Sequence, residues 1–154
     1  IGHDVNYRVT EIVWAQFFYD NKFKPSIAQK RLFEANRFGR KSGIGFYDYR
    51  EGAATLTPNK DQVLGEYIFT RIISMLINEA IDALFLNIGT KEDIDLAMTK
   101  GVNYPKGLLL WADEIGLENV LGKLEELFAE YGEDRYRPSP LLRRMVAKGH
   151  KFFN

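Results

Sequence analysis

The sequence contains no cysteine and only two histidines among its 154 residues. The absence of thiols excludes disulfides, thiolate catalysis and thiolate metal ligands, and it fits a reducing, cytoplasmic location. His3 and His150 stand near opposite ends of the chain and lack the spacing of a histidine metal motif. We therefore expect no metal site and no histidine-based catalytic triad.

A net charge of either sign is also missing, because 21 Lys and Arg side chains balance 21 Asp and Glu side chains. Without a positive field, we expect no nucleic-acid partner and no membrane partner. The most apolar window, residues 67–88, is about as long as a membrane span. It is predicted to be a buried helix instead, because it contains four polar or charged side chains, namely Arg71, Asn78, Glu79 and Asp82.

Apolar residues at helical spacing, with Gly and Pro between the segments, predict an all-α fold. Ser26 and the Thr90–Asp93 pair are expected to cap helices at their N-termini, and Gly132 and Gly149 to end helices. No stretch shows convincing strand alternation. The expected helices are 4–19, 27–36, 63–88, a segment after Thr90 that ends near Gly101, 108–114, 117–131 and a last one between Pro140 and Gly149.

The chain repeats itself. Ile1-Gly2, a helix, the turn Lys22–Ser26 and a short helix recur as Ile115-Gly116, a helix, the turn Arg135–Ser139 and a short helix. The long helix that precedes the second copy has no counterpart before Ile1, so we expect a piece of a longer protein. The predicted organisation is the second half of a first repeat at 1–50, a linker at 51–62 and a near-complete second repeat at 63–154.

The stretch GRKSGIGFYDY, from Gly39 to Tyr49, combines two basic residues with close glycines and aromatics. It lacks the third glycine of a dinucleotide fingerprint, follows a helix and does not match a phosphate-binding P-loop. A glycine turn that folds an aromatic segment back on the helices is the favoured interpretation. The alternative is that Arg40 or Lys41 contacts a phosphate-bearing ligand.

Glu79 and Asp82 share one face of the long predicted helix, with Asn78 beside them. Such a strip favours capping of neighbouring loops or pairing with an arginine such as Arg71, and an acid–base pair is the alternative. The basic end of the last helix is interpreted as a solvated face that suits the helix dipole. It consists of Arg143, Arg144, Lys148 and Lys151.

Several motifs in one order closely resemble the C-terminal domain of 3-hydroxyacyl-CoA dehydrogenases, particularly the 3-hydroxybutyryl-CoA dehydrogenases that carry this domain twice. They are the turns KFKPS and RYRPS, GRKSGIGFYDY, NEAIDALFLNIGTKEDIDLAMTKGVNYPKG and WADEIGLENV. The resemblance covers nearly the whole chain. It implies a helical domain like the C-terminal domain of 6-phosphogluconate dehydrogenase, with one partial and one near-complete repeat. Dehydrogenases of that wider group are a less favoured alternative, because PSxxQ, GRKSGxGFYDY and EDIDxAM match the acyl-CoA branch.

The resemblance implies an NAD-dependent oxidoreductase of fatty-acid metabolism. Its N-terminal Rossmann domain would bind NAD and carry the catalytic His–Glu pair, and that domain is not within these residues. The helical domain would make the subunit contact and close over the acyl-CoA substrate. We therefore expect this chain to bind no cofactor and to be inactive by itself.

In this family the helical domain supplies one catalytic Asn from an Asn-Arg pair near the start of its long helix. The matching pair here is Thr70-Arg71, so Thr70 occupies the Asn position. A hydroxyl lacks the planar amide that would hold two groups in place, and the second copy is therefore expected to be non-catalytic.

For assembly, the resemblance implies either a homodimer or pairing of the two repeats within one chain. A partner is expected to cover the apolar face of the first predicted helix, which includes Val9, Val13 and Phe17. A hypothesis of another class is a free-standing helical module that binds a protein or CoA without catalysis.

Overall fold

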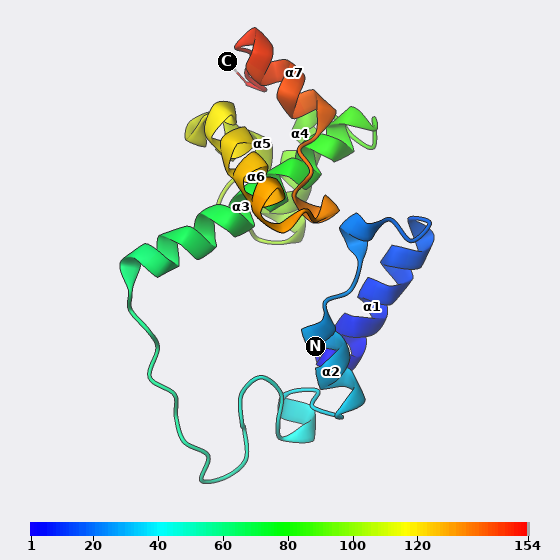
Figure 1. Ribbon diagram of the computed structural model, residues 1–154, viewed down its shortest axis with the longest axis vertical. Helices are drawn as coiled ribbons and strands as arrows, with labels where there is room; N and C mark the ends of the chain where they lie inside the picture. The colour runs from blue at the N-terminus through cyan, green and yellow to red at the C-terminus, as the bar shows by residue number, and fades with distance from the viewer. Residues whose placement is uncertain (154) are drawn as a thin grey trace. The chain divides into compact units, whose positions relative to one another are not determined.

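The computed structural model describes residues 1–153. The chain divides into two compact units, Ile1–Asn59 (unit 1) and Lys60–Asn154 (unit 2), and each is described by itself (Figure 1). The regular elements of the described residues are helices. Pairing of the β type is limited there to two isolated bridges, Gly39 with Ile44 and Ile44 with Asp48. The all-α prediction is confirmed.

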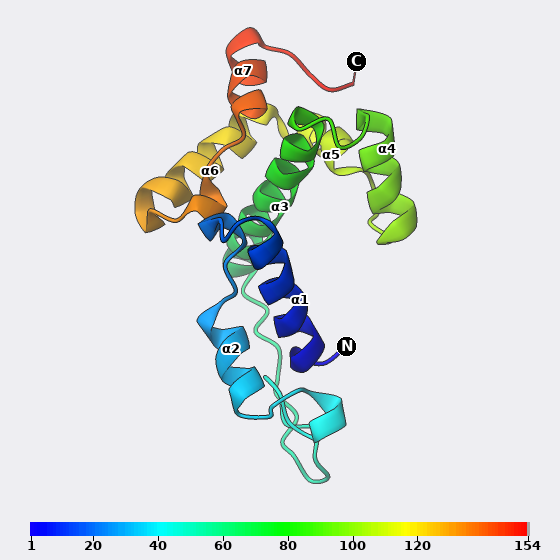
Figure 2. The ribbon, with the colours of Figure 1, turned by 90° about the vertical axis from the view of Figure 1, so that its right-hand side faces the viewer.

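Unit 1 is a pair of helices with short turns between and after them. The helices α1 (His3–Gln16) and α2 (Ile27–Glu34) lie side by side, as Figures 1 and 2 both show, and two 3-10 turns complete the unit, η1 (Asn21–Phe23) and η2 (Arg40–Ser42). The predicted cap at Ser26 is confirmed: its hydroxyl accepts the Gln29 N–H at 3.1 Å, and the Gln29 side chain accepts the Ser26 N–H at 2.9 Å.

The core of unit 1 is small. Tyr7 packs against Phe33 with 5.0 Å between ring centroids, and Tyr7 is the one buried apolar or aromatic side chain among the described residues of this unit. Along α1 and at its C-cap, by contrast, a row of apolar side chains is between 36% and 60% exposed: Val5, Val9, Ile12, Val13 and Phe17. Such a row on a soluble helix marks a surface that another element covers.

The segment 37–49, named the strap below, is a chain reversal held by its own backbone. Gly39 N–H donates to Ile44 O at 2.9 Å, and Tyr49 N–H donates to Gly43 O at 2.9 Å. Gly39 and Gly43 have φ of 108° and 73°, values that glycine adopts without strain. A Cβ at Gly45 would lie 2.8 Å from the Gly39 Cα. The glycines therefore serve the predicted turn.

The aromatic side chains of the strap are less covered than expected. Phe46 meets His3 edge to face at 4.9 Å, yet Phe46 is 65% exposed and Tyr47 58% exposed. The predicted glycine turn is present, and Phe46 contacts the start of α1, while Phe46 and Tyr47 stay largely exposed. The backbone of the strap, rather than its rings, makes most of the contacts that hold it.

Unit 2 is a bundle built around one long helix, α3 (Gln62–Phe85), which packs against the four other α-helices of the unit (Figure 1). The further elements are α4 (Lys91–Leu96), the π-helical turn η3 (Ala97–Gly101), α5 (Leu108–Ile115), α6 (Leu117–Tyr131), η4 (Asp134–Tyr136) and α7 (Pro140–Lys148). The fully buried side chains of unit 2 include Ile77 and Ile81 of α3, Leu109 of α5, Leu124 of α6 and Leu142 of α7.

The predicted ends of these helices are largely confirmed. Thr90 accepts the Asp93 N–H at 3.1 Å, and Gly132 and Gly149 end α6 and α7 in the left-handed conformation. Two differences appear. The long helix ends at Phe85 instead of residue 88, and the helix after Thr90 finishes as a π-helical turn.

The prediction that the long helix is surrounded along its length was wrong for its first half. The second half carries the core, with Ile73, Ile77 and Ile81 at most 3% exposed. In the first half the apolar side chains are 38% to 78% exposed: Val63, Leu64, Tyr67, Ile68, Phe69 and Ile72. The sequence pattern identified an apolar helix, but other helices of unit 2 bury only half of it.

The two segments that are predicted to be repeats share a pattern of local backbone hydrogen bonds. Asn6 N–H donates to Gly2 O, and Val120 N–H donates to Gly116 O, 114 residues later. Further backbone bonds recur 113 residues apart, from the 3-10 turn to the end of the short helix: Phe23–Asp20 with Tyr136–Glu133, Lys24–Asn21 with Arg137–Asp134, Lys30–Ser26 with Arg143–Ser139, Asn36–Phe33 with Gly149–Val146, and Arg37–Leu32 with His150–Met145. This recurrence supports the predicted repeat.

Candidate functional site

Thr70 and Arg71 lie where α3 passes from its exposed half to its buried half. The Thr70 side chain is exposed, whereas Arg71 is half-buried. The Arg71 guanidinium lies over the rings of Tyr131 and Tyr136, 4.8 and 5.1 Å from their centroids, and it donates to the Tyr136 hydroxyl. Arg71 thereby ties α3 to the end of α6 and to η4.

Electrostatics keep this arginine charged. Burial acts to lower the pKa of Arg71, but the hydrogen bond with Tyr136 and the charge interactions with both tyrosines outweigh it, so the pKa lies above its usual value. Thr70, one residue earlier, offers a single hydroxyl donor to solvent. Arg71 therefore has a structural role and Thr70 presents an exposed hydroxyl. The two side chains do not form a general acid–base pair.

Asn78, on the buried half of α3, holds a turn of the chain. It is 0% exposed, its amide NH₂ donates to Arg137 O at 3.1 Å, and its amide oxygen accepts the Ser139 N–H at 2.8 Å. The interpretation that the polar strip caps a neighbouring loop is confirmed for Asn78. Arg71 contacts the two tyrosines described above.

Arg40 and Lys41, the candidate ligand contacts, both have partners within unit 1. The Lys41 ammonium lies 2.5 Å from the Asp4 carboxylate, a bond that lowers the pKa of Asp4. The Arg40 guanidinium stacks over Tyr49 at 4.9 Å from the ring centroid. These contacts explain both side chains structurally, and a phosphate contact stays a prediction.

Of the remaining candidates, the two histidines lie in different units, and two of the basic residues of the last helix have partners in unit 2. His3 belongs to unit 1 and His150 to unit 2, and no cluster of three or more His, Asp or Glu suited to a metal occurs in residues 1–153. Arg143 pairs with Glu125, and Arg144 lies over the Phe85 ring at 5.5 Å. Within the same described range, the helices are too short or too polar to cross a membrane.

With this fold and these motifs in view, the chain belongs to the 3-hydroxyacyl-CoA dehydrogenase, C-terminal domain family. The family matches residues 1–49 and again residues 67–151. The unmatched stretch between them contains the linker and the first, exposed turn of α3. Two matched segments in one chain also agree with the recurring hydrogen bonds.

The relatives of this chain carry the names of dehydrogenases. The chain is 28% identical to 3-hydroxyadipyl-CoA dehydrogenase of Escherichia coli K12, over 94% of this chain and 48% of the relative. It is 43% identical to a probable 3-hydroxybutyryl-CoA dehydrogenase of Deinococcus radiodurans, over 54% of this chain and 30% of the relative. This chain thus spans about half the length or less of these relatives.

A solved structure gives the same result. The crystal structure of 3-hydroxybutyryl-CoA dehydrogenase from Escherichia coli K12 matches with a TM-score of 0.78 and 28% identity, covering 96% of this chain and 49% of that one. The structure of (S)-3-hydroxybutyryl-CoA dehydrogenase PaaH1 from Ralstonia eutropha matches with a TM-score of 0.51 and 42% identity over 52% of this chain.

Proposed function

We propose that this chain is the helical C-terminal part of an NAD-dependent 3-hydroxyacyl-CoA dehydrogenase. In this proposal it supplies association and part of the wall that faces the acyl-CoA, and it catalyses no hydride transfer without a Rossmann domain. The observation that carries the proposal is the double family match in a chain that spans about half of its relatives. In this proposal, NAD binding and the catalytic His–Glu pair belong to the Rossmann domain.

Thr70 fits a non-catalytic role for the second repeat. Its exposed hydroxyl stands where the family carries Asn, and the neighbouring Arg71 is engaged by tyrosines. Loss of one preorganised donor from an active site costs about 10²–10³ in rate. If the second repeat were the working one, Thr70 would impose such a loss on the whole enzyme.

Turnover by the purified chain tests the first part of the proposal. We expect no NADH from 3-hydroxybutyryl-CoA and NAD, and NADH production by a fusion that adds the Rossmann domain and upstream residues of the Escherichia coli relative. In that fusion, Thr70→Ala should change the rate by less than about twofold, because the residue touches no reacting atom. NADH formation by the chain alone would refute the proposal.

Binding of acetoacetyl-CoA, measured by calorimetry, separates this proposal from a free-standing CoA-binding module. Tight binding by the chain alone would favour the module. If no heat of binding is detected, the helical part acts as a scaffold and as one wall of the acyl-CoA site. Such a site is complete only when the other domain is present.

Association rests on two exposed apolar faces. One is the row on α1 that includes Val9 and Ile12, and the other is the first half of α3 that includes Ile68 and Phe69. We infer that each is covered by a repeat of the same kind, within one chain or between two chains. The small core of unit 1, with Tyr7 alone buried, makes such cover important for its stability.

Charge insertion tests this contact. Ile12→Asp places a carboxylate in the α1 face, and we expect lower mass by light scattering if the contact joins two chains, or selective loss of unit 1 structure if it lies within one. A matched change, Arg31→Asp on α2, should do neither. The inference would be contradicted if the chain is a monomer by light scattering and Ile12→Asp leaves its free energy of unfolding unchanged.

A further inference from the structure

The chain leaves α1 through two aromatic residues in the left-handed region of the backbone map. Phe18 and Tyr19 have φ of 54° and 62°. The other non-glycine residues with positive φ among residues 1–153 are asparagines, which adopt this region more readily. Because a bulky aromatic residue is strained there, the segment 17–19, named the aromatic turn below, keeps its rings against a local conformational preference.

The second repeat makes the same turn without such residues. Phe17 corresponds to Tyr131, 114 residues later, and Asp20 corresponds to Glu133, 113 residues later. One residue stands between Tyr131 and Glu133, and it is a glycine, Gly132, with φ of 64°. The first repeat places two residues there, both aromatic. Reversal of the chain alone therefore does not explain them.

Phe18 stands on a base of stacked rings. Tyr19 meets Trp14 edge to face, with 5.1 Å between ring centroids, and Phe17 lies 4.3 Å from Phe23. Phe18 itself is 94% exposed. A ring that projects into solvent from a packed base is typical of an anchor that fills a pocket on a partner.

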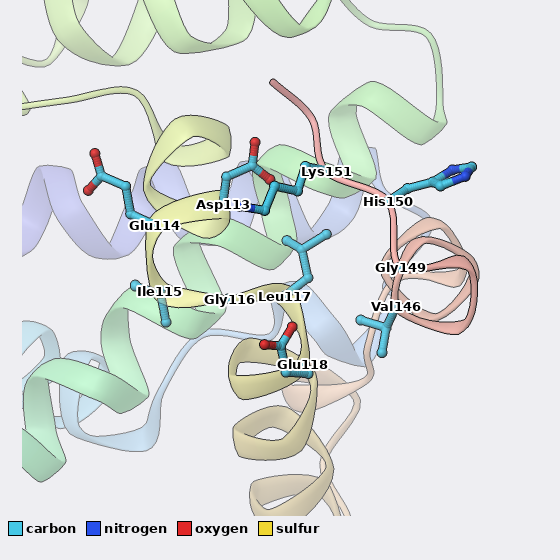
Figure 3. A pocket seen from close by; sticks show the side chains of 10 residues that line it. All are labelled: Asp113, Glu114, Ile115, Gly116, Leu117, Glu118, Val146, Gly149, His150 and Lys151. Atoms are coloured by element: carbon cyan, nitrogen blue, oxygen red, sulfur yellow. The ribbon is translucent and has the colours of Figure 1, made fainter. Parts of the chain in front are cut away.

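Unit 2 contains pockets of different chemistry. One of about 330 Å³ lies at the junction of α5 and α6 and is lined by several charged side chains, among them Asp113, Glu114 and Glu118 (Figure 3). Another of about 320 Å³, named the apolar pocket below, lies between α4 and the start of α5 and includes Phe153. An apolar cavity of about 150 Å³ holds a benzene ring, so the apolar pocket has room for a phenylalanine side chain.

The opening of the apolar pocket presents two leucines. Leu96, at the end of α4, is 54% exposed, and Leu110, in the first turn of α5, is 42% exposed. The polar groups of the lining are engaged: Asp95 accepts the first N–H groups of α5, and the Thr99 hydroxyl of the π-helical turn donates to Asp95 O at 3.0 Å. Gly107 adds no side chain to fill the space. The pocket therefore suits an apolar group.

The charges around these two features are of opposite sign. Residues 20–24, which follow the aromatic turn, carry two lysines and one aspartate, and Lys24 is exposed. The lining of the apolar pocket contains two acidic residues, Glu92 and Asp95. Lys91 lies 3.9 Å from the Glu92 carboxylate, whose side chain stays 66% exposed and so remains open to a second cation. Opposite charges favour approach of one feature to the other.

We propose that the aromatic turn of one copy of this chain docks into the apolar pocket of a second copy. Phe18 would enter between Leu96 and Leu110, with the lysines of residues 20–24 on the side of Glu92. Each copy carries one aromatic turn and one apolar pocket, so two copies can exchange both contacts. The inference goes beyond the dehydrogenase proposal and does not depend on the faces of α1 and α3 described there.

Sedimentation velocity over a range of concentrations tests this contact. Phe18→Asn removes the ring with a residue that tolerates positive φ, and Leu96→Asp places a carboxylate in the pocket. We expect each variant to raise the Kd of self-association at least about tenfold. A mixture of the two variants should associate more tightly than either alone, because an intact Phe18 then meets an intact pocket. Damage to folding would not be rescued in this way.

Matched substitutions at other exposed apolar residues serve as controls. Ile27→Asn, at a position 72% exposed on α2, and Leu86→Asp, at a position 60% exposed after α3, should leave the Kd unchanged. Leu110→Asp replaces Leu96→Asp in the mixture if urea unfolding shows that the latter does not fold. The proposal would be overturned by a chain that is monomeric at every concentration, by equal effects of Phe18→Asn and Ile27→Asn, or by absence of rescue on mixing.

Discussion

Replacing Asn78 with alanine tests how strongly one side chain of α3 holds the turn before α7. The change removes the acceptor of the Ser139 N–H and the donor to Arg137 O. Asn78 and Ser139 are 0% and 1% exposed, so the Ser139 N–H has little access to water as a replacement partner. The substitution therefore leaves polar backbone groups unsatisfied as well as a small cavity.

The expected cost can be worked from these contacts. Two hydrogen bonds contribute about 1 kcal/mol each, and burying an unsatisfied group adds about 1–3 kcal/mol. We expect the free energy of unfolding of unit 2 to fall by about 3–4 kcal/mol. For a unit of this size, that lowers the melting temperature by about 12 °C or more.

Urea unfolding of a Trp14→Phe chain measures the effect, because Trp111 then reports on unit 2 alone. Asn119→Ala is the matched control. Its amide donates to Ile115 O at 2.7 Å on the exposed surface, and its removal should cost less than about 0.5 kcal/mol. If Asn78→Ala cost no more than this control, the capping role argued for Asn78 would be refuted.

The other predictions concern caps, charge and stacking. Asp95 accepts the first N–H groups of α5, and a Cβ at Gly107 would lie 2.1 Å from its carboxyl carbon, so Gly107→Ala should destabilise unit 2 by about 1–3 kcal/mol in urea, and by less in an Asp95→Ala background. The hydrogen bond from Arg50 holds the pKa of Asp48 at about 2, below 3.8, so a carboxyl NMR titration should show that value and its return toward 3.8 in Arg50→Gln. Because this folded pKa is depressed, the contribution of Asp48 to strap stability should be complete above about pH 4 and lost as the pH falls through about 2. Arg71→Lys should lower the free energy of unfolding by about 1–2 kcal/mol, because lysine loses planar stacking between two rings.

Much of the fold could be predicted from local chemistry. Helix caps and stops depend on a few neighbouring residues, which is why Ser26, Thr90, Gly132 and Gly149 were placed correctly. The repeat was predicted because two similar turns, KFKPS and RYRPS, lie 113 residues apart, and the hydrogen bonds that recur at this offset support it.

What failed depended on distant parts of the chain. The apolar pattern of α3 gave no indication that only its second half is buried within unit 2, because periodicity shows that a face is apolar and not what covers it. The role of Asn78 was foreseen only as one possibility among several, since its partners lie 59 and 61 residues away.

Because the two units bury their side chains to different extents, we expect their backbone amides to exchange with deuterium at different rates. The second half of α3 is buried within unit 2, where α3 packs against four other helices, so we expect its N–H groups to open only when unit 2 unfolds as a whole. In unit 1 a single tyrosine is enclosed, and its helices exchange through small local openings. A deuterium map of this protein therefore contrasts slowly exchanging amides around Ile77 with rapidly exchanging ones around Val9.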